Sequence, residues 1–210
     1  MRIKSEGYPF IASMLLLTLI IYYLMDVKVA VIPFVFAIYF TYFFRHPYRK
    51  VVQDETCFYS PADGTVTGID YIYDTEYLDA KAVRVTIFLS VFDVHVNRSP
   101  ISGTIKYRSY TCGHYLPAFD NKAAFENERH AIGIDNGDIK ILVIQIAGIL
   151  ARRIVSYVDI GYELKQGECY GMIKFGSCTQ LIMPVNVQIK VKKGDKVKGG
   201  VSIIAKNTEE

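Results

Sequence analysis

The stretch Asp135-Asn-Gly-Asp-Ile-Lys-Ile-Leu-Val-Ile-Gln-Ile146 decides the fold class. Its first four residues form a turn signal, because Asn-Gly readily takes the positive φ angles of a tight hairpin. The run from Ile139 to Ile146 is rich in β-branched side chains, which favour a strand. Further strand-like runs lie at 83–92, 181–191 and 201–205, and a weak helical pattern lies at 122–130. We therefore predict a mainly β domain, a compact sandwich or barrel-like structure.

Two apolar stretches precede this domain. No charged residue occurs from Tyr8 to Met25 (18 residues) or from Val29 to Phe44 (16 residues). As helices they would be about 27 Å and 24 Å long, against a hydrocarbon core of about 30 Å. A cleaved signal peptide would end at a small-residue site, whereas here the second apolar stretch follows almost at once. We predict a two-helix membrane hairpin in residues 1–44, spanning or deeply embedded, with helices at about 8–25 and 29–44, and a second domain in residues 45–210.

Basic residues flank the predicted hairpin on both sides. Arg2 and Lys4 precede it, and Arg45, Arg49 and Lys50 follow it. Loops rich in Lys and Arg tend to stay in the cytoplasm. We therefore expect both ends of the hairpin, and the domain after it, on the cytoplasmic side of the cell (inner) membrane.

Charge and cysteine content argue against two other classes of protein. Of 24 Lys/Arg and 21 Asp/Glu, three and two lie in residues 1–44, which leaves 21 and 19 in the rest, a balance of +2. Nucleic-acid binding usually needs a dense basic face, so we predict no nucleic-acid partner. The four cysteines show no paired metal-ligand spacing, and we predict no metal site. They are Cys57, Cys112, Cys169 and Cys178.

The segment Phe175-Gly-Ser-Cys178 contains the groups needed for breakage of its own backbone. Gly176 leaves its carbonyl open to attack, and its backbone can take unusual conformations. The Ser177 hydroxyl could attack that carbonyl and convert the amide to an ester, and elimination would then leave a pyruvoyl group. A Gly-Ser pair is also common in ordinary turns, so this segment alone does not settle its role.

Two further residues complete an acid, base and nucleophile set with Ser177. Asp63 lies in Ser60-Pro-Ala-Asp-Gly-Thr-Val66, and His95 lies in Val91-Phe-Asp-Val-His-Val-Asn-Arg-Ser-Pro100. In such a set an aspartate orients the imidazole and the imidazole deprotonates the hydroxyl. Taken singly, Asp63 is equally typical of a turn and His95 of an apolar core.

Five ordered motifs resemble those of the short-form phosphatidylserine decarboxylases. The resemblance runs from about Phe44 to Ala205, and Cys178 departs from it, because Ser, Thr or Arg is common there. The motifs are Ser60-Pro-Ala-Asp-Gly64, Phe88-Leu-Ser-Val-Phe-Asp-Val-His-Val-Asn97, Asn127-Glu-Arg129, Gln145-Ile-Ala-Gly-Ile-Leu-Ala-Arg-Arg-Ile154 and Gly171-Met-Ile-Lys-Phe-Gly-Ser177.

This resemblance implies a proenzyme that cuts itself between Gly176 and Ser177. The products would be chain 1–176 (beta) and chain 177–210 (alpha), which stay associated, and Ser177 would become the pyruvoyl group without any external cofactor. His95 would be the base, held by Asp63, and later the proton donor to the substrate. The mature enzyme would convert phosphatidylserine to phosphatidylethanolamine in phospholipid biosynthesis, and family analogy predicts a homodimer.

Substrate contacts are expected from a few basic and aromatic residues. Arg152 and Arg153 are candidates for the lipid phosphate, because a guanidinium binds phosphate oxygens in pairs. They could instead pair with Glu126 or Glu128. His114 and Tyr115 lie in a loop-like stretch that could line the mouth of the pocket.

Three alternatives remain open from the sequence. Asp63, His95 and Ser177 would also serve a membrane-bound serine hydrolase. Gly194–Gly200 follows the Gly-Asp-x-Val-x-x-Gly pattern of biotinyl- and lipoyl-carrier sandwiches, which would suit a non-catalytic membrane-tethered carrier or interaction module. The same decarboxylase chemistry could also act on an ether-linked serine phospholipid.

Overall fold

The computed structural model describes residues 2–113, 127–148, 153–174 and 177–208. The chain divides into two compact units, Met1–Tyr48 and Arg49–Glu210. Of the predicted site residues, His114, Tyr115, Arg152 and Gly176 lie outside the described residues, as does Glu126.

The first unit is a helical hairpin. Its elements are β1 (Arg2–Ile3), a 3-10 turn (Ser5–Gly7), α1 (Tyr8–Leu24), α2 (Val27–Phe43) and β2 (Arg45–His46). Asp26 caps α2, because its Oδ1 accepts a hydrogen bond from the Lys28 N–H at 2.7 Å. Antiparallel pairing of β1 with β2 joins the two ends of the hairpin.

The helices of this unit present apolar side chains to the outside. Among the described residues one helical stretch, Ser5–Leu24, is long and apolar enough to cross a membrane, with 20 residues and a mean hydropathy of 1.8. Helix α2 is apolar but has 17 residues. An apolar helix near the N-terminus is a weak sign of membrane association, so the placement of both helices in a bilayer belongs to the proposed function.

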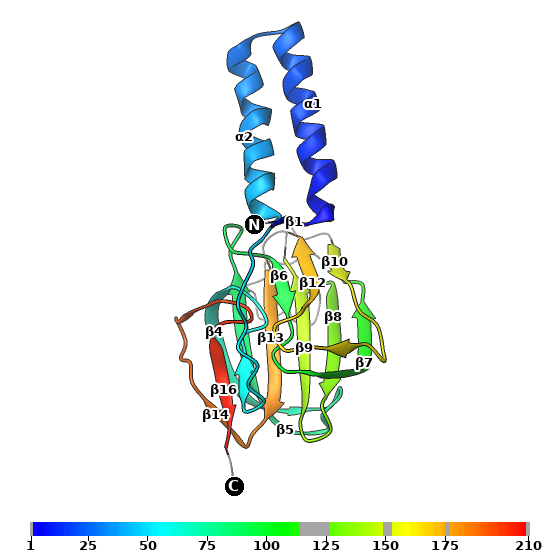
Figure 1. Ribbon diagram of the computed structural model, residues 1–210, viewed down its shortest axis with the longest axis vertical. Coiled ribbons are helices and arrows are strands. Elements are labelled where there is room, and N and C mark those ends of the chain that lie inside the picture. Colours follow the sequence, from blue (N-terminus) through cyan, green and yellow to red (C-terminus); the bar gives the residue numbers. More distant parts are fainter. Residues whose placement is uncertain (1, 114–126, 149–152, 175–176, 209–210) are drawn as a thin grey trace. The chain divides into compact units, whose positions relative to one another are not determined.

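Strands dominate the second unit, so the predicted mainly β fold is confirmed (Figure 1). One curled sheet has the order β11-β7-β8-β9-β13-β5-β4-β15, and two three-stranded sheets have the orders β10-β12-β6 and β14-β16-β3. The strands are β3 (Cys57–Tyr59), β4 (Gly64–Asp74), β5 (Ala80–Leu89), β6 (Val96–Arg98), β7 (Gly103–Thr111), β8 (Arg129–Asp135), β9 (Lys140–Ala147), β10 (Arg153–Ser156), β11 (Glu163–Leu164), β12 (Cys169–Lys174), β13 (Ser177–Pro184), β14 (Val187–Ile189), β15 (Lys196–Val197) and β16 (Ile203–Asn207).

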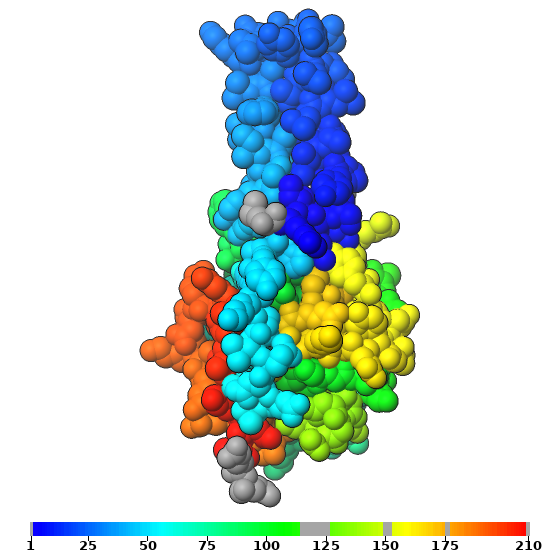
Figure 2. Space-filling view, in the orientation of Figure 1, coloured from blue at the N-terminus to red at the C-terminus, as the bar shows by residue number. Residues whose placement is uncertain are grey.

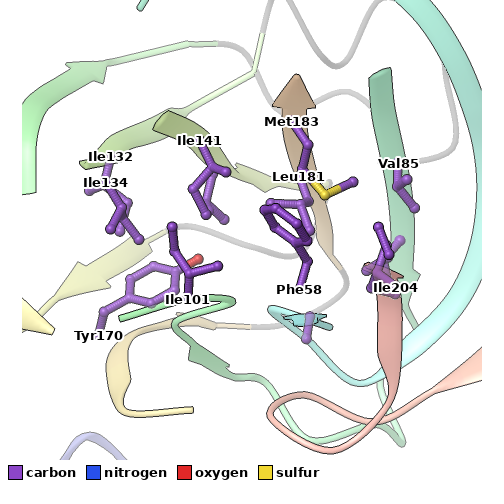
Figure 3. Close-up of a cluster of buried hydrophobic side chains, with 14 of the residues drawn as sticks. Phe58, Val85, Ile101, Ile132, Ile134, Ile141, Tyr170, Leu181, Met183 and Ile204 are labelled. Atoms are coloured by element: carbon purple, nitrogen blue, oxygen red, sulfur yellow. The ribbon is translucent and has the colours of Figure 1, made fainter. Parts of the chain in front are cut away.

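The main core fills the space on one face of the large sheet (Figure 3). Leu181 and Met183 of β13 point into it together with Phe58 and Tyr170, and all four are buried. Side chains alternate between the faces of a strand. Cys178 and Ile182 of the same strand therefore belong to a second apolar cluster.

The segment after Arg49 connects the loop between β11 and β12 with the C-terminal strand β16. Figure 2 shows it in cyan, between the C-terminal strands in red and the yellow residues that follow position 150. Asp54 N–H donates to the Gln166 side chain at 2.8 Å, and Asn207 N–H donates to the Thr56 carbonyl at 2.7 Å. Parts far apart in the sequence are thus fastened on this face.

The sequence predicted the hairpin turn correctly but not every local feature. Asp135 pairs with Lys140 across the β8–β9 turn, and Gly137 takes a φ of 99°. The helical pattern at 122–130 lies mostly outside the described residues, and its end is wrong: Arg129 and His130 belong to β8, which is paired on both edges. The Gly194–Gly200 pattern contains the short strand β15.

Candidate active site

Ser177 begins β13 and lies between two other strands of the large sheet. It pairs with Leu89 of β5 on one edge and with Ala147 of β9 on the other. Its side chain is fully buried, and its Oγ has no hydrogen-bond partner among the described residues. Leaving a buried hydroxyl without a partner costs about 1–3 kcal/mol. Such a group calls for a functional explanation.

The predicted cleavage site joins two different sheets. Strand β12 ends at Lys174 in a three-stranded sheet, and β13 starts at Ser177 in the eight-stranded sheet. Residues 175–176 connect them and lie outside the described residues. A break at this junction would not remove a residue from either of the two strands.

His95 lies just before β6 and is fully buried. Its Nδ1 is 3.0 Å from the carbonyl oxygen of Asp93. Because a carbonyl can only accept, Nδ1 carries the proton in the neutral ring, and the lone pair is on Nε2. The His95 carbonyl also accepts from the Ile173 N–H at 3.1 Å. That contact holds His95 beside the end of β12.

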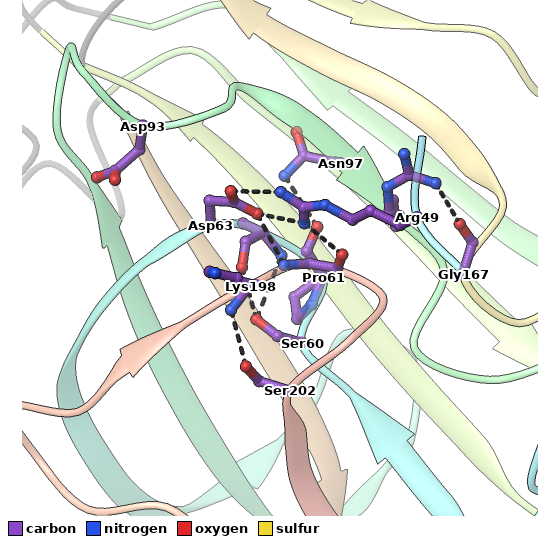
Figure 4. A network of polar contacts seen from close by, with 12 residues as sticks. Arg49, Ser60, Pro61, Asp63, Asp93, Asn97, Gly167, Lys198 and Ser202 are labelled. Atoms are coloured by element: carbon purple, nitrogen blue, oxygen red, sulfur yellow. Dashed lines mark hydrogen bonds and ion pairs between the residues drawn. The ribbon is translucent and has the colours of Figure 1, made fainter. Parts of the chain in front are cut away.

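Asp63 does not orient His95 in this structure, contrary to the sequence-based expectation. Both carboxylate oxygens bind the Arg49 guanidinium at 2.5 Å, and Oδ1 also accepts from the Gly199 N–H at 2.8 Å (Figure 4). A bidentate pair with a guanidinium is among the stronger polar interactions. The carbonyl of Asp93, only two residues from the imidazole, takes the place expected for Asp63.

Arg49 and Gly199 are site residues that the sequence reasoning missed. Arg49 Nη1 also donates to the Gly199 carbonyl at 2.5 Å, so Asp63 and Arg49 together hold both polar groups of one peptide residue. A Cβ on Gly199 would lie 3.2 Å from Ala62 Cα, tighter than most such contacts. The Gly194–Gly200 pattern was the available signal, whereas Arg49 had none beyond its charge.

A second guanidinium adds positive charge beside Asp63. Arg98 is buried and donates to the Gly167 carbonyl at 2.9 Å. Burial lowers the pKa of Arg98, and neighbouring Arg49 lowers it further. Two guanidinium groups, those of Arg49 and Arg98, therefore lie near one another and near the Asp63 carboxylate.

The Asn127-Glu-Arg129 motif holds β9, the strand that pairs with β13 at Ser177. Asn127 Nδ2 donates to the Ala147 carbonyl at 2.7 Å, and the Ala147 N–H donates to the Glu128 carbonyl at 2.9 Å. Ala147 is the register partner of Ser177. Two of the sequence motifs thus meet at one strand pair.

Arg153 is exposed on β10, directly opposite Lys174 of β12. Like charges directly opposite each other on paired strands are destabilising, unless an anion lies near both. Glu128 is engaged elsewhere, because its Oε1 accepts from the Tyr110 hydroxyl at 2.7 Å and from the Ile154 N–H at 3.1 Å. Among the described residues no ion pair joins Glu128 to Arg153, whereas Arg152 and Glu126, the other members of that alternative, lie outside them.

Cys178 is on the opposite face of β13 from Ser177. Its thiol is buried in the second apolar cluster, and burial raises the pKa of Cys178 to about 12. Burial therefore favours the neutral thiol of Cys178. Within the described residues no group of three or more His, Cys, Asp or Glu side chains is arranged to hold a metal ion.

Comparison with known proteins gives one consistent result. The profile of a family described as phosphatidylserine decarboxylase matches residues 36–205. Curated relatives named phosphatidylserine decarboxylase proenzyme include those of Carboxydothermus hydrogenoformans, 42% identical over 96% of this chain and 94% of the relative, and Syntrophus aciditrophicus, 43% identical over 95% of each. That of Amoebophilus asiaticus is 46% identical over 80% of this chain and 76% of the relative. These similarities lend no support to the hydrolase or carrier alternatives.

Proposed function

The chain belongs to the phosphatidylserine decarboxylase family, and on that premise we propose that it is a self-processing carboxy-lyase that makes phosphatidylethanolamine from phosphatidylserine. The observation that carries the proposal is the buried Ser177 hydroxyl at the junction of two sheets, which has no hydrogen-bond partner within the described parts of the chain. It is the group that a self-cleaving proenzyme requires at this place.

The first step breaks the backbone. Ser177 Oγ attacks the carbonyl carbon of Gly176, and Nε2 of His95 takes the hydroxyl proton. The carbon–nitrogen bond breaks, the nitrogen of residue 177 gains a proton, and an ester joins the two parts. Nδ1 of His95 stays bonded to the Asp93 carbonyl, which keeps Nε2 available as the base.

The second step converts residue 177. Loss of its Cα proton and breakage of the Cβ–O bond release the Gly176 carboxylate and leave a dehydroalanine. Its tautomer, an imine, is hydrolysed by water to a pyruvoyl group with release of ammonia. The hydroxyl that is lost forms no hydrogen bond to any residue that the structure describes.

A pyruvoyl group supplies a carbonyl that can delocalise the charge left when the substrate's carboxyl group departs. In our proposal it is made from Ser177, and no external cofactor is needed. His95, now protonated, delivers the proton that replaces the carboxyl group. Asp63 with Arg49 acts as a positioning pair, because it holds Gly199 of chain 177–210 to chain 1–176.

The lipid phosphate is proposed to bind Arg153, which lies opposite Lys174 across β10 and β12. Arg152, His114 and Tyr115 remain further candidates for substrate contacts. The helical hairpin is proposed to anchor the enzyme in the cell (inner) membrane with its catalytic domain on the cytoplasmic side. Anchoring suits a diacyl substrate, because each lipid CH₂ moved into water costs about 0.8 kcal/mol.

Turnover of defined lipid tests this function. Purified protein in mixed micelles should release carbon dioxide and phosphatidylethanolamine in equal amounts, and phenylhydrazine, which reacts with ketones, should abolish both. The Ser177→Ala variant should be inactive. Turnover that survives phenylhydrazine, or labelling of Ser177 by a fluorophosphonate in active enzyme, would support a serine hydrolase instead.

A further inference from the structure

Four polar side chains are buried among the apolar strands behind Ser177. They are Asn97, His130, Gln145 and Thr179, and none is more than 2% exposed. Burying a polar group is costly unless it is hydrogen-bonded. These four come from four different strands, β6, β8, β9 and β13.

The four side chains form one continuous chain of hydrogen bonds. His130 Nδ1 lies 3.1 Å from Gln145 Oε1, and Gln145 Nε2 donates to Asn97 Oδ1 at 2.8 Å. Asn97 Nδ2 donates to Thr179 Oγ1 at 3.1 Å. At the other end, Arg108 Nε donates to His130 Nε2 at 3.2 Å.

The donor-to-acceptor direction of these hydrogen bonds is fixed at Arg108. A guanidinium has no acceptor, so His130 Nε2 must accept and Nδ1 must carry the proton. Nδ1 then donates to Gln145, and each amide passes the direction on toward Thr179. A second proton on His130 would place two donors face to face at 3.2 Å. The series of hydrogen bonds from Arg108 to Thr179 is therefore complete only when His130 is neutral.

Asn97 connects all three segments of the candidate active site. Asn97 follows His95 by two residues. Its Nδ2 also lies 3.4 Å from the carbonyl oxygen of Pro61, which precedes Asp63 by two residues. Its hydrogen-bond partner Thr179 follows Ser177 by two residues. Residues two apart on a strand share a face, so Thr179 and Ser177 point to the same side of β13.

The backbone of β12 leaves space for these hydrogen-bonded side chains. A Cβ on Gly171 would lie 2.6 Å from the Val155 carbonyl oxygen and 3.0 Å from Gln145 Nε2. Glycine at 171 therefore allows β12 to pass close to the Gln145 amide. This observation is independent of the hydrogen bonds themselves.

We propose that Asn97, Gln145 and His130 are positioning residues for self-cleavage, which hold Thr179, and through it the Ser177 strand, against the His95 segment. The proposal rests on the proposed function, because it needs the cut at Ser177. It predicts that cleavage requires neutral His130 and slows as the pH falls.

The surroundings of His130 favour the neutral form. Burial lowers the pKa of His130, and the positive charge of Arg108 lowers it further, whereas the hydrogen bond to Gln145 and the more distant Asp159 raise it. Asp159 is exposed and pairs with Arg108 at 3.1 Å. On the remaining side the Tyr110 ring lies 6.4 Å from the imidazole, and its hydroxyl binds Glu128.

Two variants of Thr179 test the last hydrogen bond, the one from Asn97 to Thr179. Thr179→Val keeps the shape but removes the acceptor for Asn97, and we expect its cleavage half-life to be about tenfold longer. Thr179→Ser keeps the hydroxyl and should cut within about threefold of the wild-type rate. Half-lives are read from pulse-labelled protein made in a cell-free system with micelles. Equal half-lives for the Val, Ser and wild-type chains would overturn the proposal.

A His130→Gln variant tests the dependence on protonation. An amide also has one donor and one acceptor, but it does not titrate. Wild-type cleavage should slow more steeply than cleavage of the Gln variant as the pH falls below about 6.5, because both chains need neutral His95 as the base but only the wild type also needs neutral His130. If a Thr179 variant fails to fold, this profile decides: a Gln variant with the wild-type fall in rate overturns the proposal. Uncut wild-type chain at every pH would instead refute the proposed function.

Discussion

At the scale of single residues, the site depends on which polar groups are satisfied and which are not. Asp63, Arg49 and Gly199 satisfy one another, whereas the Ser177 hydroxyl has no partner among the described residues. The sequence motifs named Asp63 and His95 as site residues, and their catalytic roles stay predictions. They could not show that Asp63 binds Arg49, because Arg49 lies 14 residues away in a stretch without any motif.

A prediction at this scale concerns the Asp63–Arg49 pair. The Arg49 side chain is 10% exposed and the Asp63 side chain 13%, so removal of one charge leaves the other poorly solvated. In the uncut Ser177→Ala chain, Asp63→Asn should lower the free energy of unfolding by about 1–3 kcal/mol, measured by urea unfolding in micelles.

The matched control is Asp70, which pairs with Arg84 at 3.1 Å but is 51% exposed. An exposed pair contributes about 0–1 kcal/mol, so Asp70→Asn should have little effect. Equal effects of the two substitutions would contradict the positioning role of Asp63.

At the scale of secondary-structure elements, β13 connects the cleavage site to the core. The alternating and β-branched patterns predicted the 135–138 turn and the runs that correspond to β5, β9, β13 with β14, and β16, because those signals are local. The same patterns did not predict that β13 begins at Ser177 or that it lies between β5 and β9, because strand order depends on contacts distant in sequence. In the sequence, the buried Asn97 and Gln145 could be recognised only as polar residues within apolar motifs.

The position of β13 predicts that the two chains stay together after the cut. It has eight register pairs with β5 and six with β9, and β16 of the same fragment pairs with β3. Chain 177–210 should therefore coelute with chain 1–176 in size-exclusion chromatography and separate only in concentrated urea. Elution of the short chain alone in native buffer would contradict this arrangement.

Two substitutions, one in β13 and one in the loop that follows it, measure how much core packing contributes to the association of the two chains. Leu181 is fully buried, so Leu181→Ala should cost about 2–5 kcal/mol and lower the urea concentration at which the chains separate. Val185 is 46% exposed, and Val185→Ala should leave that concentration nearly unchanged.

At the scale of the whole molecule, the two units have different surfaces. The first exposes apolar side chains along both helices, whereas the second encloses its apolar side chains in a β core. Large exposed apolar surfaces in a folded chain mark contact with a membrane or a partner. Composition alone predicted this division, because an uncharged run of about 18 residues is unusual in soluble domains.

The hairpin predicts how the protein partitions. After an alkaline carbonate wash the full chain should remain in the membrane pellet, and detergent should release it. Replacement of Leu16 and Leu19, both exposed on α1, by Lys should move a large share to the carbonate supernatant. Full release of the wild-type chain by carbonate would contradict a membrane-embedded hairpin.

The mass of the mature protein tests the central claim most directly. The uncut chain is 23.8 kDa. The account predicts a short chain of about 3.6 kDa that begins at position 177 and is about 17 Da lighter than the peptide 177–210, because a pyruvoyl group has replaced the amino-terminal serine. Active enzyme that consists only of the 23.8 kDa chain, or a short chain with an intact serine at its start, would contradict it.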